Sequence, residues 1–236
     1  MGKETFEFLA HQAVTAAEKA VIDHGDDTFL IKEDGVHRFT KDDSPRTLQV
    51  HTLTGLVDAI KTGALEKTIA SIHVYDADRV LVYGQLDEYG HRPVLLEASP
   101  FTETMRFGQF YDQEDFQISL RSRFVENEHR QILIEFAGNL VEKNEQNYTD
   151  DGFSQQATVK SGVASVAKAI VPSPVTLQPY RTFIEVEQPA SEFIFRVQKG
   201  PKMALFESDG NAWKNTAIKS VAAYLTAELP DVHIFA

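Results

Sequence analysis

Residues 192–229 read EFIFRVQKGPKMALFESDGNAWKNTAIKSVAAYLTAEL and contain two strand patterns followed by a helix pattern. Apolar and polar residues alternate over 192–198, which predicts a strand with one buried face. Residues 202–207 are apolar on both parities, as in a central strand that is covered on both sides. Apolar residues then recur at helical spacing over 212–229, until Pro230 stops the helix. The stretch therefore predicts an α+β fold, with a mainly antiparallel sheet packed by a C-terminal helix.

The rest of the chain predicts additional N-terminal helices and hairpins. Helical spacing of apolar residues indicates helices over 5–23, 53–65, 112–126 and 128–141. Alternating or β-branched runs indicate strands over 28–31, 36–40, 71–75, 79–85, 93–98, 155–161, 164–170 and 175–188. The last of these runs changes parity near Pro179, which predicts a bulge or a break between two strands.

Residues 112–126 fit both a strand pattern and a helix pattern, and their charges decide between the two. Phe116, Ile118 and Leu120 alternate with polar residues, but Phe116, Leu120 and Phe124 also follow one another at intervals of four. Acidic residues begin the segment and arginines end it, which matches the dipole of a helix. The segment is therefore predicted to be helical.

A charged loop at 41–46 is the first plausible linker in the chain. It separates a helix-and-hairpin appendage at 1–45 from a single α+β domain at 46–236. A sub-boundary near 100–150 is a second option, because residues 1–100 could form an α+β unit of their own.

The chain has 236 residues and is acidic, with 35 Asp and Glu against 23 Lys and Arg, a net charge of −12. Residues 1–150 hold 27 of the acids and 15 of the bases, while the remainder is balanced at 8 and 8. An acidic surface without a basic cluster argues against direct nucleic-acid binding. The excess is interpreted as a solubilising surface, with a DNA-mimicking patch or a basic partner as the alternative.

Several kinds of chemistry lack their usual residues. Without cysteine there are no disulfides, thiolate nucleophiles or cysteine zinc sites. The eight histidines are at least 13 residues apart, and no phosphate-binding glycine loop or serine-hydrolase elbow occurs. No apolar run is long enough to span a bilayer, and the first six residues are too acidic for a signal peptide. We therefore expect no metal, no cofactor, no membrane association and no enzymatic activity.

Charged residues over 180–198 form the main candidate site. At strand spacing their polar side is expected to be a binding or subunit-contact face, made of Arg181, Glu185, Glu187, Glu192 and Arg196. The two nearest carboxylates, Glu185 and Glu187, could instead be half of a hydrolytic or metal site. Further on, Asp209 and Asn211 precede a helix whose amides could hold an anion, although a turn with Asn211 as N-cap explains the same residues.

The distinctive part of the sequence lies between residues 149 and 213. It includes the segments 149–152, 154–162, 172–177, 179–183, 185–189, 192–196 and 204–214. This part resembles a family of hypothetical proteins from tailed phages and prophages of Gram-positive bacteria. More remotely, it resembles the uncharacterised YfdQ-like phage family, and the likeness covers roughly residues 50–229.

The resemblance implies a gene that a phage expresses in the host bacterial cytoplasm, in an early, non-virion region. It brings no catalytic residues, because the family has none established. The expected function is that of a non-enzymatic, homo-oligomeric accessory or binding protein during infection or lysogeny. The alternatives are an anti-defence protein that sequesters a nucleotide signal or mimics DNA, a metal-dependent enzyme acting on nucleotides or nucleic acid, and a virion component.

Overall fold

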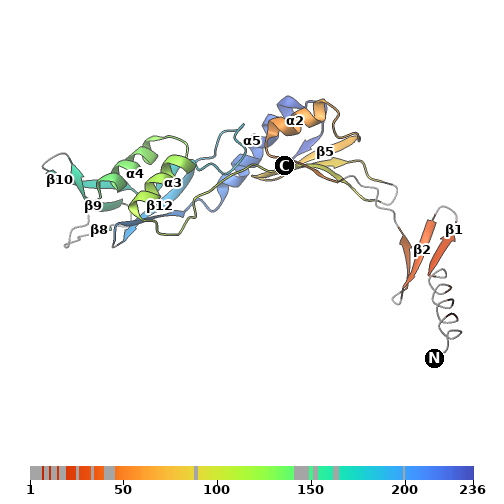
Figure 1. Ribbon diagram of the computed structural model, residues 1–236. Coiled ribbons are helices and arrows are strands. Elements are labelled where there is room, and N and C mark those ends of the chain that lie inside the picture. The colour runs from red at the N-terminus through yellow and green to blue at the C-terminus, as the bar shows by residue number, and fades with distance from the viewer. Residues whose placement is uncertain are drawn as a thin grey trace. The chain divides into compact units, whose positions relative to one another are not determined.

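The computed structural model in Figure 1 describes residues 7, 11, 15, 20–24, 27–32, 35–39, 46–87, 90–140, 149–150, 154–161, 165–198 and 200–236. The chain divides into two compact units, Met1–Pro45 with Leu86–His91, and Arg46–Gln85 with Arg92–Ala236. Helices combine with antiparallel and mixed sheets, and a C-terminal helix packs on one of them, so the predicted α+β class is confirmed.

The first unit contains a three-stranded antiparallel sheet of β1 (Val21–His24), β2 (Asp27–Lys32) and β3 (Gly35–Phe39). The predicted hairpin is therefore confirmed. The predicted helix over 5–23 extends too far, because Val21–His24 pairs with β2 and its β-branched residues favour a strand. Most of the predicted linker, residues 41–45, lies outside the described residues.

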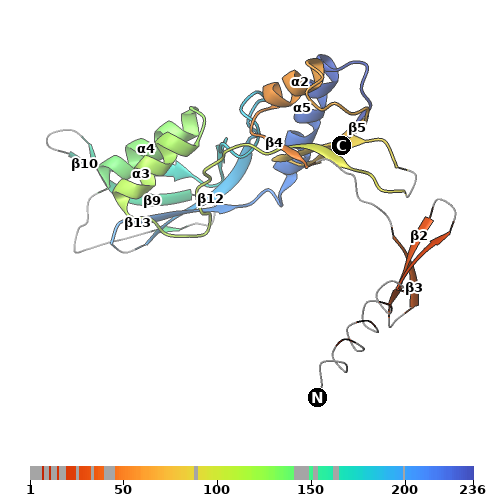
Figure 2. The same cartoon turned by 45° about the vertical axis from the view of Figure 1, so that its right-hand side comes forward.

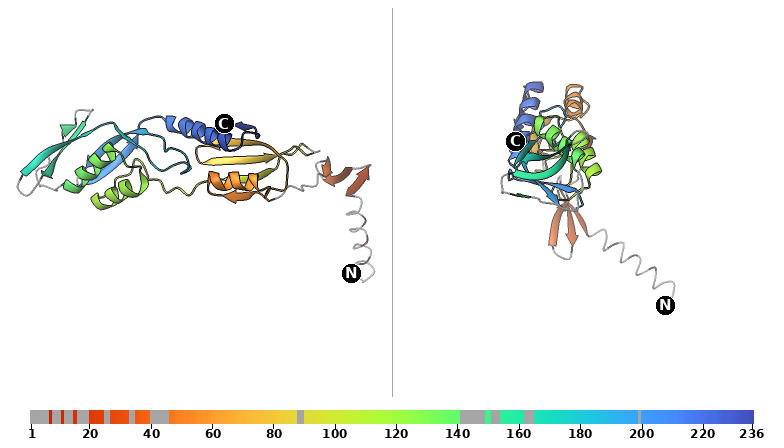
Figure 3. Two further views of the ribbon diagram at one scale, coloured as in Figure 1. Left: turned by 90° about the horizontal axis from the view of Figure 1, so that it is seen from above. Right: turned by 90° about the vertical axis from the view of Figure 1, so that its left-hand side faces the viewer.

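In the second unit, one sheet has the strand order β14-β5-β6-β7-β4. Its strands are β4 (Leu48–Val50), β5 (Ile69–Asp76), β6 (Arg79–Gly84), β7 (Val94–Ala98) and β14 (Ile234–Phe235). The three central strands are antiparallel, and each edge strand runs parallel to its neighbour. Two helices, α2 (Leu53–Lys61) and α5 (Ala212–Glu228), cover the same face of this sheet (Figures 1 and 3).

A second three-stranded sheet in this unit contains β11 (Val175–Leu177), β12 (Ser191–Gln198) and β13 (Lys202–Glu207). It packs against α3 (Gln113–Arg123) and α4 (Glu128–Asn139), which lie side by side in Figure 2. A third antiparallel sheet contains β8 (Thr149–Asp150), β9 (Ser154–Ser161) and β10 (Ser165–Pro172). The predicted helices over 112–126 and 128–141 are confirmed with slightly tighter bounds.

The second unit has two hydrophobic cores. The phenylalanine core includes Phe116, Phe193 and Phe195 and lies under α3 and α4. The aliphatic core includes Ile72 and Leu225 and lies between α2, α5 and the five-stranded sheet. The chain builds part of the aliphatic core first, then the phenylalanine core, and returns with α5 to complete the aliphatic one.

The strand prediction over 175–188 is wrong beyond residue 177. Pro179 donates no backbone hydrogen bond, and the side chain of Gln188 takes the place of a neighbouring strand. Its Oε1 accepts from the amides of Arg181 and Thr182 at 3.0 and 3.2 Å, and its Nε2 donates to the carbonyl of Phe183 at 3.0 Å. The segment is therefore an ordered, irregular loop folded around one buried amide.

The loop between β5 and β6 is tied to α5 through Asp76. Its carboxylate accepts from the Ala77 amide at 2.7 Å and from Lys214 Nζ at 3.2 Å. The Ala77 hydrogen bond holds the pKa of Asp76 below its usual 3.8, burial opposes this, and Lys214 adds to it. A lowered pKa means that the ionised carboxylate stabilises the folded state.

We expect Asp76→Ala to lose about 1 kcal/mol of unfolding free energy at pH 7. The contribution is present above pH 3.8 and is lost as the pH falls through the lower, folded-state pKa. Urea unfolding of both proteins at pH 7 and pH 3 checks this. An equal difference at the two pH values would contradict a role for the ionised form.

Candidate functional site

The structure separates the charged residues that the sequence places on one strand face. Arg181 and Asp209 enter a buried polar cluster, and Glu185 lies half-buried at the start of α2. Arg196 is half-buried and its Nη1 donates to the carbonyl of Phe195 at 2.9 Å. The exposed members of the set are Glu187, Glu192 and Asn211. The predicted common face is wrong, because residues 180–188 are not a strand.

Asn211 does not cap α5 as predicted. Its φ of 65° places it in the left-handed region, and its side chain makes no capping hydrogen bond. Asp209 Oδ1 instead accepts from the Asn211 amide at 3.1 Å. Asparagine tolerates this conformation better than most residues, which explains its place in the turn.

The buried polar cluster surrounds the guanidinium of Arg181, which is 4% exposed. Nη1 donates to Glu207 Oε1 at 2.8 Å, and Nη2 donates to Ser191 Oγ. Ser191 Oγ donates in turn to Asp209 Oδ2 at 2.6 Å, and the guanidinium carbon lies 3.8 Å from the centre of the Trp213 ring. Burial lowers the pKa of Arg181 to about 10, against the pull of Glu207 and Asp209, so the group stays charged at neutral pH.

Glu185 occupies the N-terminus of α2. Its Oε1 accepts from the amide of Thr54 at 3.0 Å and from the hydroxyl of the same residue at 3.3 Å. The next amide, that of Gly55, donates to the capping hydroxyl of Thr52 at 2.9 Å. These two donors, which could attract an external anion, are already used within the protein.

A cleft of about 610 Å³ opens beside the loop that carries Arg181. Four separate segments supply its walls, and the residues are His51, Thr52, Pro100, Phe101, Thr102, Glu103, Ser122, Arg123, Tyr180, Thr182 and Ile184. Two backbone hydrogen bonds join the last two segments, from the Tyr180 amide to the carbonyl of Arg123 at 3.0 Å and from the Val125 amide to the carbonyl of Gln178 at 2.9 Å. The cleft is therefore built on an ordered backbone frame.

Alternate side chains of the loop point in different directions. Tyr180, Thr182 and Ile184 line the cleft, whereas Arg181 enters the polar cluster and Phe183 enters the aliphatic core. Residues 181, 182 and 183 are all buried, so they anchor the wall of the cleft from which Tyr180 and Ile184 project.

The cleft exposes an unusual amount of apolar surface. Phe101 is 83% exposed and Ile184 is 79% exposed. The ring of His51 stacks on Phe101 with centroids 3.7 Å apart, and His51 Nδ1 lies 2.8 Å from the carbonyl of Ser99. Stacking and the hydrogen bond both favour a fixed orientation for the imidazole, which makes the pair a flat aromatic platform.

Most hydroxyl groups in the cleft already have partners. Thr52 accepts from Gly55, Thr182 donates to the carbonyl of Ala77, and Ser122 donates to the carbonyl of Ile118 at 2.8 Å. A cleft whose polar groups are satisfied internally favours an apolar guest, because little hydrogen bonding with water is lost on binding.

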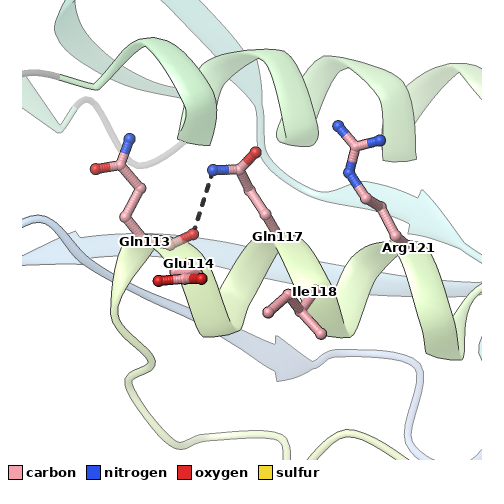
Figure 4. Close-up of a pocket in the computed structure, with 5 residues that line it drawn as sticks. All are labelled: Gln113, Glu114, Gln117, Ile118 and Arg121. Carbon is pink, nitrogen blue, oxygen red and sulfur yellow. Dashed lines mark hydrogen bonds between the residues drawn. The ribbon is translucent and has the colours of Figure 1, made fainter.

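A second, smaller depression of about 320 Å³ lies along one face of α3. Figure 4 shows its lining residues, Gln113, Glu114, Gln117, Ile118 and Arg121, on successive turns of that one helix. Gln113 Nε2 donates to the carbonyl of Ala137 at 2.5 Å, and Gln117 Nε2 donates to the carbonyl of Gln113 at 3.4 Å. These amides therefore serve helix packing, and the depression is a weaker candidate than the cleft.

Across the residues that the structure describes, no group of three or more His, Cys, Asp or Glu side chains could hold a metal ion. No helix in the described part of the chain is both long and apolar enough to cross a membrane.

Comparisons with protein-family models, with curated proteins and with solved structures found no match for this chain. The resemblance to tailed-phage proteins therefore stays a prediction, and the geometry of the cleft carries the functional argument.

Proposed function

We propose that the chain is a phage-encoded, non-enzymatic binding protein of the host cytoplasm that acts during infection or lysogeny, and that its cleft holds a protein partner. The observation that carries the proposal is the exposure of Phe101 and Ile184, which both line the cleft. Clustered exposed apolar side chains with a polar rim are typical of protein-binding sites, and aromatic residues often dominate their binding energy.

The cleft has few groups that could hold the phosphate of a sequestered nucleotide. Among the described residues that line it, Arg123 is the only lysine or arginine. The nearby α2 amides of Thr54 and Gly55 already donate within the protein. A bound phosphate would therefore have few donors.

The metal-dependent alternative rests on Glu185 and Glu187 sharing a strand face. Glu185 is instead bonded at the start of α2, and Glu187 is exposed on a loop. The pairing that motivated this alternative is absent from the loop as the structure describes it.

We expect Phe101→Ser to reduce capture of a specific partner at least tenfold, because loss of a central aromatic anchor costs about 2 kcal/mol or more. Tagged proteins are purified from phage-infected cells and the bound proteins are quantified by mass spectrometry. The matched control is Tyr75→Ser, which alters a 56% exposed aromatic residue outside the cleft. At least one protein should bind both the wild type and Tyr75→Ser but not Phe101→Ser. If there is no such protein, the proposal is wrong.

Native mass spectrometry of the same wild-type sample tests the remaining expectations. A homo-oligomer without added mass supports the proposal that the protein self-associates and binds other proteins. An added mass of a few hundred daltons per subunit would instead support the anti-defence alternative.

A further inference from the structure

Among the described residues that line the cleft, Arg123 supplies the guanidinium, and its ion pair is weak. The side chain of Arg123 is 32% exposed, and its ion-pair partner, Glu103, lies 3.9 Å away with a side chain that is 91% exposed. A pair this long and this solvated contributes little, because both charges remain largely hydrated. Arg123 is therefore available to a better-placed carboxylate.

A second group next to Arg123 also lacks a partner. Tyr180 lines the cleft, and its hydroxyl forms no hydrogen bond with the part of the chain that the structure describes. The backbone hydrogen bond from the Tyr180 amide to the carbonyl of Arg123 keeps the two residues adjacent. Together they offer donors to a ligand in the cleft.

The apolar part of the cleft is suited to a ring. The His51–Phe101 pair provides a flat surface, and Ile184 provides an aliphatic contact. Rings stack on such surfaces in offset or edge-on arrangements that add to the burial of apolar area. An aromatic side chain therefore matches the platform better than a branched aliphatic one.

We infer that the cleft recognises a peptide segment that carries an aromatic side chain and a neighbouring acidic one. The ring lies on the His51–Phe101 platform, and the carboxylate accepts hydrogen bonds from Arg123 and Tyr180. This inference rests on the proposed function, since it specifies the chemistry of the protein partner. The carboxylate of the peptide replaces the long contact between Arg123 and Glu103, because a well-placed carboxylate can bind a guanidinium through two hydrogen bonds.

Three fluorescently labelled peptides test the inference by fluorescence polarisation. Their sequences are Gly-Ser-Gly-Trp-Glu-Gly-Ser-Gly, the same peptide with Lys for Glu, and the same peptide with Ala for Trp. We expect the wild type to bind the Trp-Glu peptide about tenfold more tightly than either of the others, as one charge-assisted contact or one anchor would require. The preference for Glu over Lys should decrease with added salt.

Variants of the protein separate the two contacts. Arg123→Glu should reverse the preference between the Glu and Lys peptides, and Arg123→Gln should abolish it without reversing the charge. The control is Arg121→Glu on the same helix, outside the cleft, which should keep the wild-type preference. Phe101→Ser should weaken binding of both tryptophan peptides. Circular dichroism of each variant confirms that it is folded.

Three results would overturn the inference. They are equal binding of the Glu and Lys peptides by the wild type, no binding of either tryptophan peptide, and tighter binding of a nucleoside monophosphate than of the Trp-Glu peptide in competition. The proposed function is judged separately, by partner loss with Phe101→Ser in infected cells. If Phe101→Ser loses a partner in infected cells but the wild type shows no preference between the Glu and Lys peptides, the proposed binding function stands and the aromatic–acidic motif is wrong.

Discussion

Replacing Arg181 with alanine should lower the free energy of unfolding by about 3 kcal/mol, since a hydrogen bond to a charged group contributes about 1.5–3 kcal/mol and the partner Glu207 stays partly solvated. The change deletes the hydrogen bonds to Glu207 and Ser191. It also removes the group that covers the Trp213 ring and the positive charge that attracts the half-buried Asp209 carboxylate. The loop that forms one wall of the cleft should lose its anchor as well.

Urea unfolding followed by far-ultraviolet circular dichroism measures this effect. The control is Arg92→Ala, because Arg92 is exposed and such changes usually stay within about 0.5 kcal/mol. A loss below about 1 kcal/mol for Arg181→Ala would show that the cluster does not stabilise the fold as described.

Gln188→Ala should cost about 3 kcal/mol, although the side chain carries no charge. The buried amide satisfies the backbone amides of Arg181 and Thr182 and the carbonyl of Phe183. Each buried group left without a partner costs about 1–3 kcal/mol, and partial access to water should limit the sum.

Hydrogen exchange gives a readout specific to this loop. In Gln188→Ala the amides of Arg181 and Thr182 should exchange faster than in the wild type, relative to amides in β12 and β13. Gln198→Ala is the control, since Gln198 is exposed at the end of β12. Unchanged protection of the two loop amides would contradict the role assigned to Gln188.

Local signals made the regular elements predictable. The helix over 112–126 could be distinguished from a strand because its terminal charges match the dipole, and Asp112 does cap it through the amide of Asp115 at 2.9 Å. The strand over 202–207 could be predicted as covered on both sides because Met203, Ala204 and Leu205 are apolar on both parities, and all three are buried. Its predicted central position is wrong, because β13 lies at the edge of the sheet β11-β12-β13.

The loop over 180–188 could not be predicted, because the side chain of Gln188 makes the backbone hydrogen bonds that a neighbouring strand would otherwise make. The alternation of Arg181 and Glu185 with apolar residues is real, but it reflects alternate anchoring and lining of a loop. Nothing in the pattern shows that Gln188 turns back to bind the backbone. Side-chain to backbone hydrogen bonds of this kind compete with sheet formation without a periodic signature.

The cleft was missed for a different reason. Its residues come from four segments, and each segment alone has an ordinary explanation as a turn, a helix end or a loop. Phe101 was the one available signal, since a phenylalanine directly after Pro100 lies in a connection that contributes no strand or helix. An aromatic residue in a loop therefore indicates a binding site better than a pair of charged residues at strand spacing does.

The order in which the sheet partners are made has a consequence for synthesis on the ribosome. Strands β5, β6 and β7 leave the ribosome early, but the helix α5 and the strand β14 that complete their packing follow more than a hundred residues later. At roughly 5–20 residues per second, about 6–23 s separate the end of β7 from the start of α5. During that interval the apolar face of the nascent sheet lacks α5, so a chaperone that shields early strands should raise the yield of this protein.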